Sequence, residues 1–401
     1  MVMEIKWAKN TMPKSQLNNV DCYITADDAK CAYSFHKTIP GYKITPLVKL
    51  KSLAQHFGVG EIYVKDESKR FDLNAFKITG AGFAMAKYLS ISLGKDISEV
   101  TFEELKSPKT KKKTGDITFY SATDGNHGRA VAWMASKLGY KAVINMPKGS
   151  TERRRQNILN TGAQCVITEM NYDDTVRYTN NQAKENNGIV VQDTAWKGYE
   201  EIPTWIMQGY SAMALEIEEQ MDYPPTHIFL QAGVGSFASA IQSYYANVYK
   251  ENPPMVVIVE SDQADCFYLS ALANDGKARF KKGDMLTLMA GLACGEPNTI
   301  SFEIIKNHSA YFASCADIVT AYGMRILGNP MGQDERIMSG ESGAVTTGLL
   351  AYIMTDTKYQ SFRKELKLDK NSKILLISTE GDTDPECYRD VVWRGRNQYS
   401  K

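Results

Sequence analysis

With 401 residues, of which 43% are hydrophobic and 23% charged, the chain has the composition of a globular protein large enough for two domains. Its net charge of +1 gives no electrostatic reason to expect nucleic acid or a membrane as a partner. No run approaches the roughly 20 apolar residues that cross a bilayer, and residues 1–10 carry no secretory signal. Seven scattered cysteines and five dispersed histidines predict a reducing cytoplasm and no metal site.

In chain order, short strands rich in β-branched residues alternate with helices. Residues 1–40 are interpreted as a wrapping segment, a helix is expected over 81–93, and the lysine-rich stretch 106–115 is interpreted as a surface loop. Strands are expected at 61–65, 116–120, 141–147, 164–167, 188–192, 226–231, 255–260 and 373–378. This alternation predicts two α/β units with parallel sheets and a crossover near residue 195.

Lys77 is the first candidate for chemistry. It follows an aromatic residue, Phe76, just after the first expected strand, and Gly80 and Gly82 come soon after it. A lysine amine whose pKa is lowered by burial or by nearby cations can trap a carbonyl carbon. Taken alone, Lys77 would be interpreted as a solvated lysine at a loop-to-helix junction. The loops further along the chain argue for the chemical role.

The stretch from Gln231 to Ser236 (Gln-Ala-Gly-Val-Gly-Ser) follows a buried strand and opens a helix. Its glycines let backbone N–H groups point at one anion, and the helix N-terminus adds positive character. The pattern is neither GxGxxG nor a Walker loop, which argues against a nicotinamide oxidoreductase. It predicts a phosphate cradle, and a tight turn without a ligand is the alternative.

Two further loops follow expected strands, at 121–128 and 378–384. In the first, Asn126 could bind a phenolic oxygen, His127 is interpreted as structural, and Asp124 suits either a helix cap or an acid–base role. Ligands of α/β sheets lie beyond the carboxyl ends of the strands, so these loops should share one crevice. A lysine, a phosphate cradle and a hydroxyl-bearing loop together predict one phosphorylated aldehyde cofactor.

These motifs, in this order, resemble the fold type II pyridoxal-phosphate enzymes, the relatives of threonine and serine dehydratases, over nearly the whole chain. Further stretches resemble the diaminopropionate ammonia-lyase family, and they lie at 123–128, 192–196, 293–298, 339–345 and 379–384. The resemblance implies an α/β fold of two parallel-sheet domains with the active site in the crevice between them. It implies a large domain of residues 1–84 and 196–401, a small domain of residues 85–195, and a cytoplasmic homodimer with a small-molecule amino acid as substrate.

Carried over position by position, the resemblance implies that Lys77 holds pyridoxal 5′-phosphate as a Schiff base. The phosphate would be held by Gly233, Val234, Gly235 and Ser236. Asn126 would face the phenolic oxygen, Phe76 would pack beside the ring, and Ser378 or Thr379 would meet the pyridine nitrogen. A hydroxyl there does not enforce a protonated ring, which favours elimination.

The reaction that the resemblance implies is α,β-elimination of D- and L-2,3-diaminopropionate to pyruvate and two ammonia, a carbon–nitrogen lyase activity. Lys77 would remove the α-proton of the L-substrate, and Asp124 that of the D-substrate. Asp193 would bind the β-amino group or help it leave. The alternatives are a serine/threonine dehydratase, a cysteine-synthase-like β-replacement enzyme, and a non-catalytic binding protein of the same fold. Whether Cys266 and Cys294 pair stays open.

Overall fold

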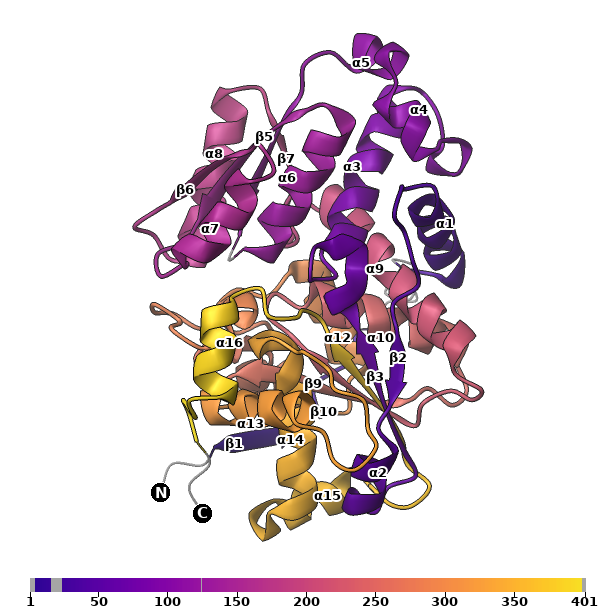
Figure 1. The fold of residues 1–401 in the computed structure, drawn as a ribbon, viewed down its shortest axis with the longest axis vertical. Helices are drawn as coiled ribbons and strands as arrows, with labels where there is room; N and C mark the ends of the chain where they lie inside the picture. Colours follow the sequence, from indigo (N-terminus) through magenta and orange to yellow (C-terminus); the bar gives the residue numbers. More distant parts are fainter. Residues whose placement is uncertain (1–3, 16–23, 124, 399–401) are drawn as a thin grey trace.

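The computed structural model describes residues 4–15, 24–123 and 125–398, which form two α/β units (Figure 1). The large unit fills the lower half of Figure 1 and the small unit the upper half. Helix α3 (Ile78–Ser92) lies between them, because it packs against α9 (Glu201–Gln220) of the large unit and α6 (Asn126–Leu138) of the small unit. Lys77 immediately precedes α3, so the boundary between the units passes beside it.

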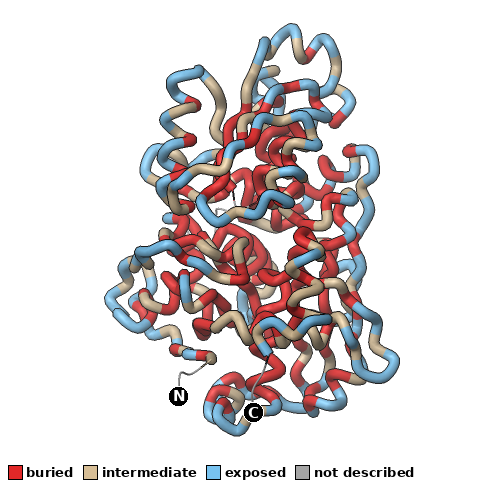
Figure 2. Tube along the Cα trace, turned by 60° about the vertical axis from the view of Figure 1, so that its left-hand side comes forward, coloured by how far each residue is buried: buried red, intermediate tan, exposed pale blue. Residues whose placement is uncertain are grey.

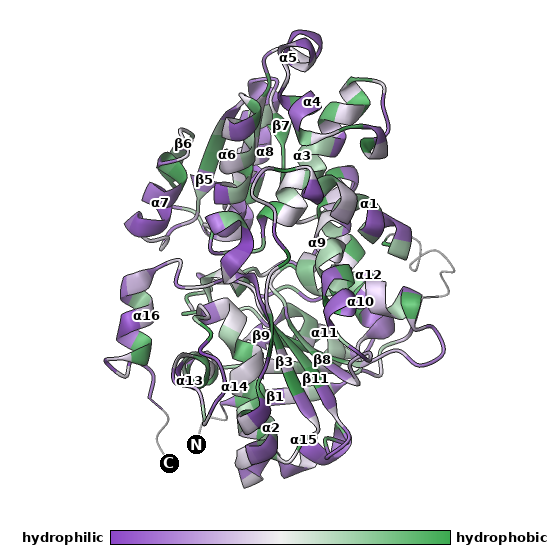
Figure 3. Cartoon of the chain, turned by 45° about the vertical axis from the view of Figure 1, so that its right-hand side comes forward, coloured by the Kyte–Doolittle hydropathy of each residue, from purple (hydrophilic) through white to green (hydrophobic). Residues whose placement is uncertain are grey.

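A seven-stranded sheet forms the centre of the large unit. Its strands lie in the order β1 (Ile5–Lys9), β10 (Tyr311–Cys315), β9 (Met255–Ser261), β8 (His227–Gln231), β11 (Lys373–Ser378), β3 (Glu61–Asp66) and β2 (Leu47–Lys49). The five central strands run parallel, whereas β1 and β2 pair antiparallel at the edges. Figure 3 shows that the central strands are hydrophobic, as expected of parallel strands covered on both faces.

Successive residues of the central strands face opposite sides of this sheet. In β11, Leu375 and Ile377 join one hydrophobic core, and Ile374 and Leu376 join the other. The first core is formed with α1 (Ala26–Lys37), α9, α10 (Ser236–Val248), α11 (Cys266–Ala273) and α12 (Thr299–His308). The second is formed with α2 (Lys51–Phe57), α13 (Asp317–Gly328), α14 (Glu341–Thr355), α15 (Gln360–Glu365) and α16 (Pro385–Val392). Figure 2 shows buried residues filling the interior of both units.

The small unit is built on a parallel sheet of four strands. They lie in the order β6 (Gln164–Ile167), β5 (Lys141–Met146), β4 (Thr118–Ala122) and β7 (Ile189–Val190). Their helices are α6, α7 (Glu152–Leu159) and α8 (Tyr172–Glu185). The predicted α/β class with parallel sheets is confirmed. The domain boundaries at residues 84 and 195 stay a prediction.

The predicted loop at 106–115 is wrong, because the structure has a helix there. After α4 (Phe102–Lys106), Ser107 caps α5 (Pro108–Thr114) by accepting a hydrogen bond from Thr110 N, and Pro108 occupies the first turn. Three lysines in the last turn of α5 complement the helix dipole. The lysine-rich composition suggested a loop, but the segment forms a capped helix. Residues 1–40, interpreted as a wrapping segment, contain the edge strand β1 and helix α1.

The described ranges contain no helix that combines the length and the apolar character needed to cross a bilayer.

His36 links α1 to the start of α3, and it should make stability depend on pH. Its Nε2 lies 2.8 Å from Thr79 O, and burial lowers its pKa from 6.5 to about 4. The folded protein therefore keeps His36 neutral while the unfolded chain protonates it. This stabilisation is complete above pH 6.5 and is lost as the pH falls from 6.5 toward 4, by about 3 kcal/mol in total.

The variant His36→Gln retains a donor for Thr79 O but does not titrate. Its free energy of unfolding, measured by urea denaturation, should fall less steeply than that of the wild type between pH 6.5 and 4. Identical pH profiles for the two proteins would contradict the assignment of this slope to His36.

Candidate active site

Lys77 is held against the loop that follows β11. Phe76 N donates to Thr379 O at 3.1 Å, and Gly381 N donates to Asn74 O at 3.0 Å. These bonds join the segment before α3 to the carboxyl end of a central strand. They place the lysine at the strand ends, where the sequence predicted a crevice.

The amine of Lys77 meets the small unit at Asp193. Lys77 Nζ lies 2.5 Å from Asp193 Oδ2, and the Asp193 side chain is almost completely buried. Burial alone would raise the pKa of Asp193, but His127 and Lys77, in their protonated forms, outweigh it and lower the pKa to about 2. Burial in turn lowers the pKa of His127, so at neutral pH that ring is uncharged. Lys77 is therefore the described cation that holds Asp193 ionised at neutral pH.

The glycine loop after β8 forms the start of α10. Gly235 has a φ of 95°, a left-handed conformation that favours glycine, and a Cβ there would lie 2.6 Å from Phe267 Cζ. No side chain caps α10. Among the described residues, the N–H groups of Val234, Gly235 and Ser236 have no hydrogen-bond acceptor. Three such donors at a helix N-terminus suit an anion.

The hydroxyl of Ser236 is engaged within the protein. Ser236 Oγ donates to the backbone oxygen of Asp193 and accepts a hydrogen bond of 2.9 Å from Asn298 Nδ2. The serine hydroxyl thus ties the glycine loop to the carboxylate that faces Lys77. Its backbone N–H, by contrast, has no hydrogen-bond acceptor among the described residues, so it is available to an anion at the start of the helix.

Two residues, Ser378 and Thr379, were predicted as alternative partners for a ring nitrogen. Ser378 is fully buried and donates to Ser339 Oγ at 2.8 Å. Thr379 lines the cavity and accepts a hydrogen bond of 2.9 Å from Gln231 Nε2. Within the described ranges the hydroxyl hydrogen of Thr379 has no acceptor, so it can donate to an unprotonated ring nitrogen.

Opposite this loop, Asn126 at the start of α6 donates from Nδ2 to Glu380 Oε2. Glu380 is buried and also accepts from Ser342 N at 3.3 Å. Phe76 lies behind the lysine, with its ring centroid 4.8 Å from those of both Tyr210 and Phe237. The aromatic group forms an apolar wall beside the polar ends of the site.

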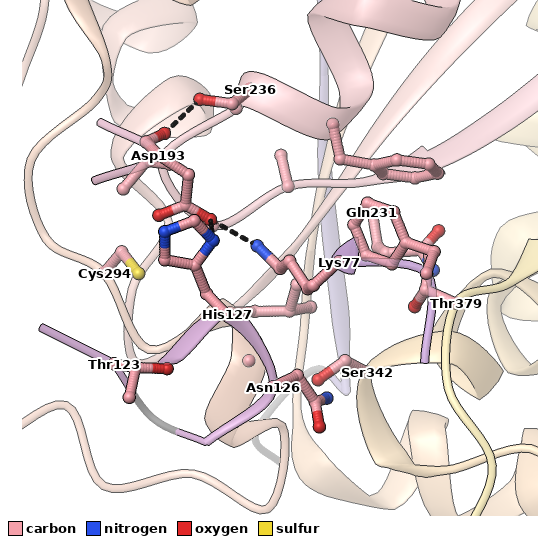
Figure 4. A pocket seen from close by; sticks show the side chains of 18 of the residues that line it. Lys77, Thr123, Asn126, His127, Asp193, Gln231, Ser236, Cys294, Ser342 and Thr379 are labelled. Atoms are coloured by element: carbon pink, nitrogen blue, oxygen red, sulfur yellow. Dashed lines mark hydrogen bonds and ion pairs between the residues drawn. The ribbon is translucent and has the colours of Figure 1, made fainter. Parts of the chain in front are cut away.

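Most of these side chains line one cavity, which encloses about 680 Å³ of empty space including its opening to solvent. Figure 4 shows Lys77, His127 and Asp193 converging in it, with Thr379 and Asn126 further along the wall. The predicted site residues that line it are Phe76, Lys77, Asn126, Asp193, Gly233, Val234, Gly235, Ser236 and Thr379. Ser378 lies outside the lining, and Asp124 lies outside the described residues.

The sequence reasoning missed several residues of the lining. Glu380, Gln231 and Tyr172 all contribute to it. Glu380 and Gln231 stand beside predicted site residues in the same loops, which was the available signal. Tyr172 is the first residue of α8, where no motif marks it. Cys266 and Cys294, whose pairing was left open, are both thiols in the structure.

Comparison with known proteins assigns this site to a class. The family of pyridoxal-phosphate dependent enzymes matches residues 39–379. Diaminopropionate ammonia-lyase of Salmonella typhimurium is 50% identical over 369 residues, which cover 91% of each chain. The structure of diaminopropionate ammonia lyase from Escherichia coli with an aminoacrylate–PLP azomethine intermediate has a TM-score of 0.89 and 47% identity, and the match covers 99% of each chain. The D-serine complex of that enzyme has a TM-score of 0.90 and 49% identity, with 98% of each chain covered.

The fold and the site are those of a pyridoxal-phosphate-dependent enzyme. Within this class, the chain belongs to the diaminopropionate ammonia-lyase family, and it is a carbon–nitrogen lyase. The described residues fit the cofactor. The unpaired N–H groups at α10 suit its phosphate, Lys77 suits its aldehyde and Thr379 suits its ring nitrogen.

Proposed function

We propose that this chain eliminates ammonia from both enantiomers of 2,3-diaminopropionate, to give pyruvate and two ammonia, with Lys77 and Asp124 as the two bases. The ion pair of Lys77 with the buried carboxylate of Asp193 inside the cavity carries this proposal. The 50% identity to a diaminopropionate ammonia-lyase favours it over a dehydratase or a β-replacement enzyme. Membership of an enzyme family likewise argues against a non-catalytic binding protein.

The residues that hold pyridoxal phosphate would be those predicted from the sequence, with one choice made between alternatives. Lys77 would bind the aldehyde carbon, and the N–H groups of residues 233–236 would bind the phosphate. Thr379 is preferred to Ser378 as the donor to the ring nitrogen, because its hydroxyl lines the cavity. Asn126 would use its second amide hydrogen toward the phenolic oxygen while Glu380 holds the first. When bound, the cofactor withdraws electrons from the α-carbon of the substrate and so makes its proton acidic.

The two bases would act from opposite faces of the substrate. Lys77 would take the α-proton of the L-enantiomer, and Asp124 that of the D-enantiomer. Asp124 lies outside the described residues, but Thr123 and Asn126, on either side of it in the chain, line the cavity. A related enzyme from Escherichia coli has been crystallised with D-serine, which supports entry of a D-amino acid.

Asp193 would serve the leaving group. When Lys77 is engaged by the cofactor, the buried carboxylate is available to bind a cationic β-amino group and to orient it for departure as ammonia. A hydroxyl leaving group offers no such ion pair. This role would give the cavity a preference for a diamino acid over serine.

The test is pyruvate release from D- and L-2,3-diaminopropionate, measured beside D- and L-serine. We expect turnover of both diaminopropionate enantiomers, and selective loss of D-turnover in Asp124→Asn. Thr123→Ser is the matched control, because it changes the residue next to Asp124 but keeps the hydroxyl at position 123. It should retain both activities. Pyruvate release from L-serine alone would move the chain to the dehydratases and leave Asp124 as a helix cap.

We propose in addition that the enzyme is a cytoplasmic homodimer in which residues 1–84 and 196–401 form one domain and residues 85–195 the other. Light scattering of the eluted protein should give twice the chain mass of 44.8 kDa. A mass of 44.8 kDa at working concentrations would argue against the dimer.

A further inference from the structure

His127, the second residue of α6, has one ring nitrogen hydrogen-bonded to the backbone. Its Nε2 lies 2.9 Å from the carbonyl oxygen of Val191. A carbonyl oxygen only accepts hydrogen bonds, so Nε2 carries a hydrogen in the neutral and in the charged ring. Nδ1 is therefore the nitrogen that gains or loses a proton.

That nitrogen faces the carboxylate of Asp193, which in turn contacts Lys77. The side chain of His127 is only 2% exposed, and Nδ1 has no hydrogen-bond partner among the described residues. Asp193 Oδ2 lies 3.7 Å from Nδ1, and the same oxygen lies 2.5 Å from Lys77 Nζ. Figure 4 shows the imidazole and the lysine amine beside this one carboxylate. A buried polar atom without a partner calls for an explanation, and this one is next to reacting groups.

We propose that His127 stores the proton that Lys77 gives up during turnover, with Asp193 Oδ2 as the carrier between them. The proposal rests on the proposed role of Lys77 in binding the cofactor. An N–H bond at Lys77 Nζ breaks as an O–H bond forms at Asp193 Oδ2. That O–H bond then breaks as an N–H bond forms at His127 Nδ1. The result is a neutral lysine, an ionised carboxylate and an imidazolium, and the reverse sequence returns the proton.

The second transfer needs a small movement. Oδ2 must approach Nδ1 from 3.7 Å to about 3 Å, the range of a hydrogen bond. In the structure this oxygen is held by the ammonium of Lys77. Once that group has given up its proton, the strongest reason for Oδ2 to stay beside Lys77 is removed. The protonated carboxyl group of Asp193 can then turn toward the ring and donate to Nδ1.

The surrounding charges favour this exchange. Burial lowers the pKa of His127, the carboxylate of Asp193 raises it, and the cation of Lys77 lowers it. Loss of the lysine charge removes one opposing influence and leaves Asp193 as a charged neighbour. Three other described titratable groups line the same cavity, namely Tyr172, Cys294 and Glu380. The hydroxyl of Tyr172 lies 3.4 Å from Asp193 Oδ1. The pKa of His127 should therefore be higher when Lys77 is uncharged than when Lys77 is an ammonium.

The first test is nitrogen NMR of the full chain labelled at histidine, with and without bound pyridoxal phosphate. The chain has five histidines, so the spectrum of His127→Gln assigns the ring by the loss of one signal set. We expect the Nε2–H form throughout, and a titration midpoint about one pH unit higher when the cofactor engages Lys77. An Nδ1–H tautomer, or a midpoint that does not move, would overturn the proposal.

The second test is the pH dependence of kcat in His127→Gln. The amide nitrogen of glutamine can donate to Val191 O, but it cannot store a proton. In the wild type we expect kcat to fall at acidic pH, where His127 is already charged. The variant should be about 10- to 100-fold slower and should lack this fall, while it keeps the cofactor absorbance and the melting temperature of the wild type.

A uniform loss of kcat with an unchanged pH profile would assign His127 a structural role only. Failure of the proposed function and failure of the proposal for His127 give different experimental results. If the enzyme forms no pyruvate from diaminopropionate, the proposed function fails, and the NMR titration still decides whether His127 exchanges its proton with Lys77.

Discussion

Replacing Lys77 by alanine is expected to lower kcat for L-2,3-diaminopropionate by at least about 10⁴-fold. The amine would be both the group that binds the cofactor and the base for the L-enantiomer, so its loss removes two functions at once. The variant should also lack the visible absorbance of the covalently bound cofactor. Pyruvate release measures the first effect, and the absorbance spectrum and the chain mass after borohydride reduction measure the second.

The matched control is Lys77→Arg, which keeps a cation beside Asp193 but cannot bind the aldehyde in the same way. It should be as inactive as Lys77→Ala while its stability stays closer to that of the wild type, because the buried carboxylate keeps a partner. Substantial turnover in either variant, with the cofactor still bound, would require another nucleophile. The proposed roles would then have to be reassigned.

The sequence allowed prediction of those parts of the site that short motifs determine. Lys77 and the glycine loop at 233–236 are local features, since each is recognised from neighbouring residues at the N-terminus of a helix. The parallel strands then bring these loops together whatever the intervening sequence. Gly235 and Thr379 follow two neighbouring strands of the large sheet, and their presence in one cavity agrees with this rule. Asp193 follows a strand of the small sheet, so the rule did not predict its position.

Contacts that depend on tertiary packing could not be predicted. Ser378 and Thr379 are adjacent hydroxyl residues, and which one reaches the cavity depends on how β11 ends against Ser339 and Gln231. Glu380 is a carboxylate in a polar loop, a pattern typical of solvated residues, yet it is buried and accepts hydrogen bonds from Asn126 of the small unit and from Ser342 of the large unit.

The contacts of His127 could be predicted from the sequence only in part. Its role in holding the loop was predicted, and the contact with Val191 O agrees with that role. The unpartnered Nδ1 beside Asp193 follows from the approach of α6 to the segment after β7. No spacing in the sequence reports that approach, because the two segments are more than 60 residues apart.

Replacing Asp193 by asparagine is expected to lower kcat for both enantiomers of diaminopropionate by about 10²- to 10³-fold. Asparagine has nearly the same shape but carries no charge, so it can neither pair with a cationic β-amino group nor accept a proton. The pKa of Asp193, lowered to about 2, means that the charge is present throughout the working pH range. The loss should therefore not be restored by a change of pH.

Comparison with serine tests whether Asp193 acts on the cationic β-amino group or in a step that all the substrates share. The hydroxyl of serine is neutral, so residual pyruvate formation from serine should fall less than formation from diaminopropionate. Asp173→Asn is the matched control, because Asp173 is a half-buried carboxylate of the same unit that does not line the cavity. Burial raises the pKa of Asp173 to about 7, so this carboxyl is partly protonated near neutral pH and asparagine should change little there.

An equal loss with serine and with diaminopropionate in Asp193→Asn would place Asp193 in a step that both substrates share. The ion pair with Lys77 identifies that step, because the carboxylate would then be needed to set the protonation of the lysine amine. The two outcomes separate a carboxylate that selects the substrate from one that prepares the base. Parallel measurement of kcat and KM for the four substrates decides between them, since selection predicts a substrate-dependent loss and preparation of the base a common one.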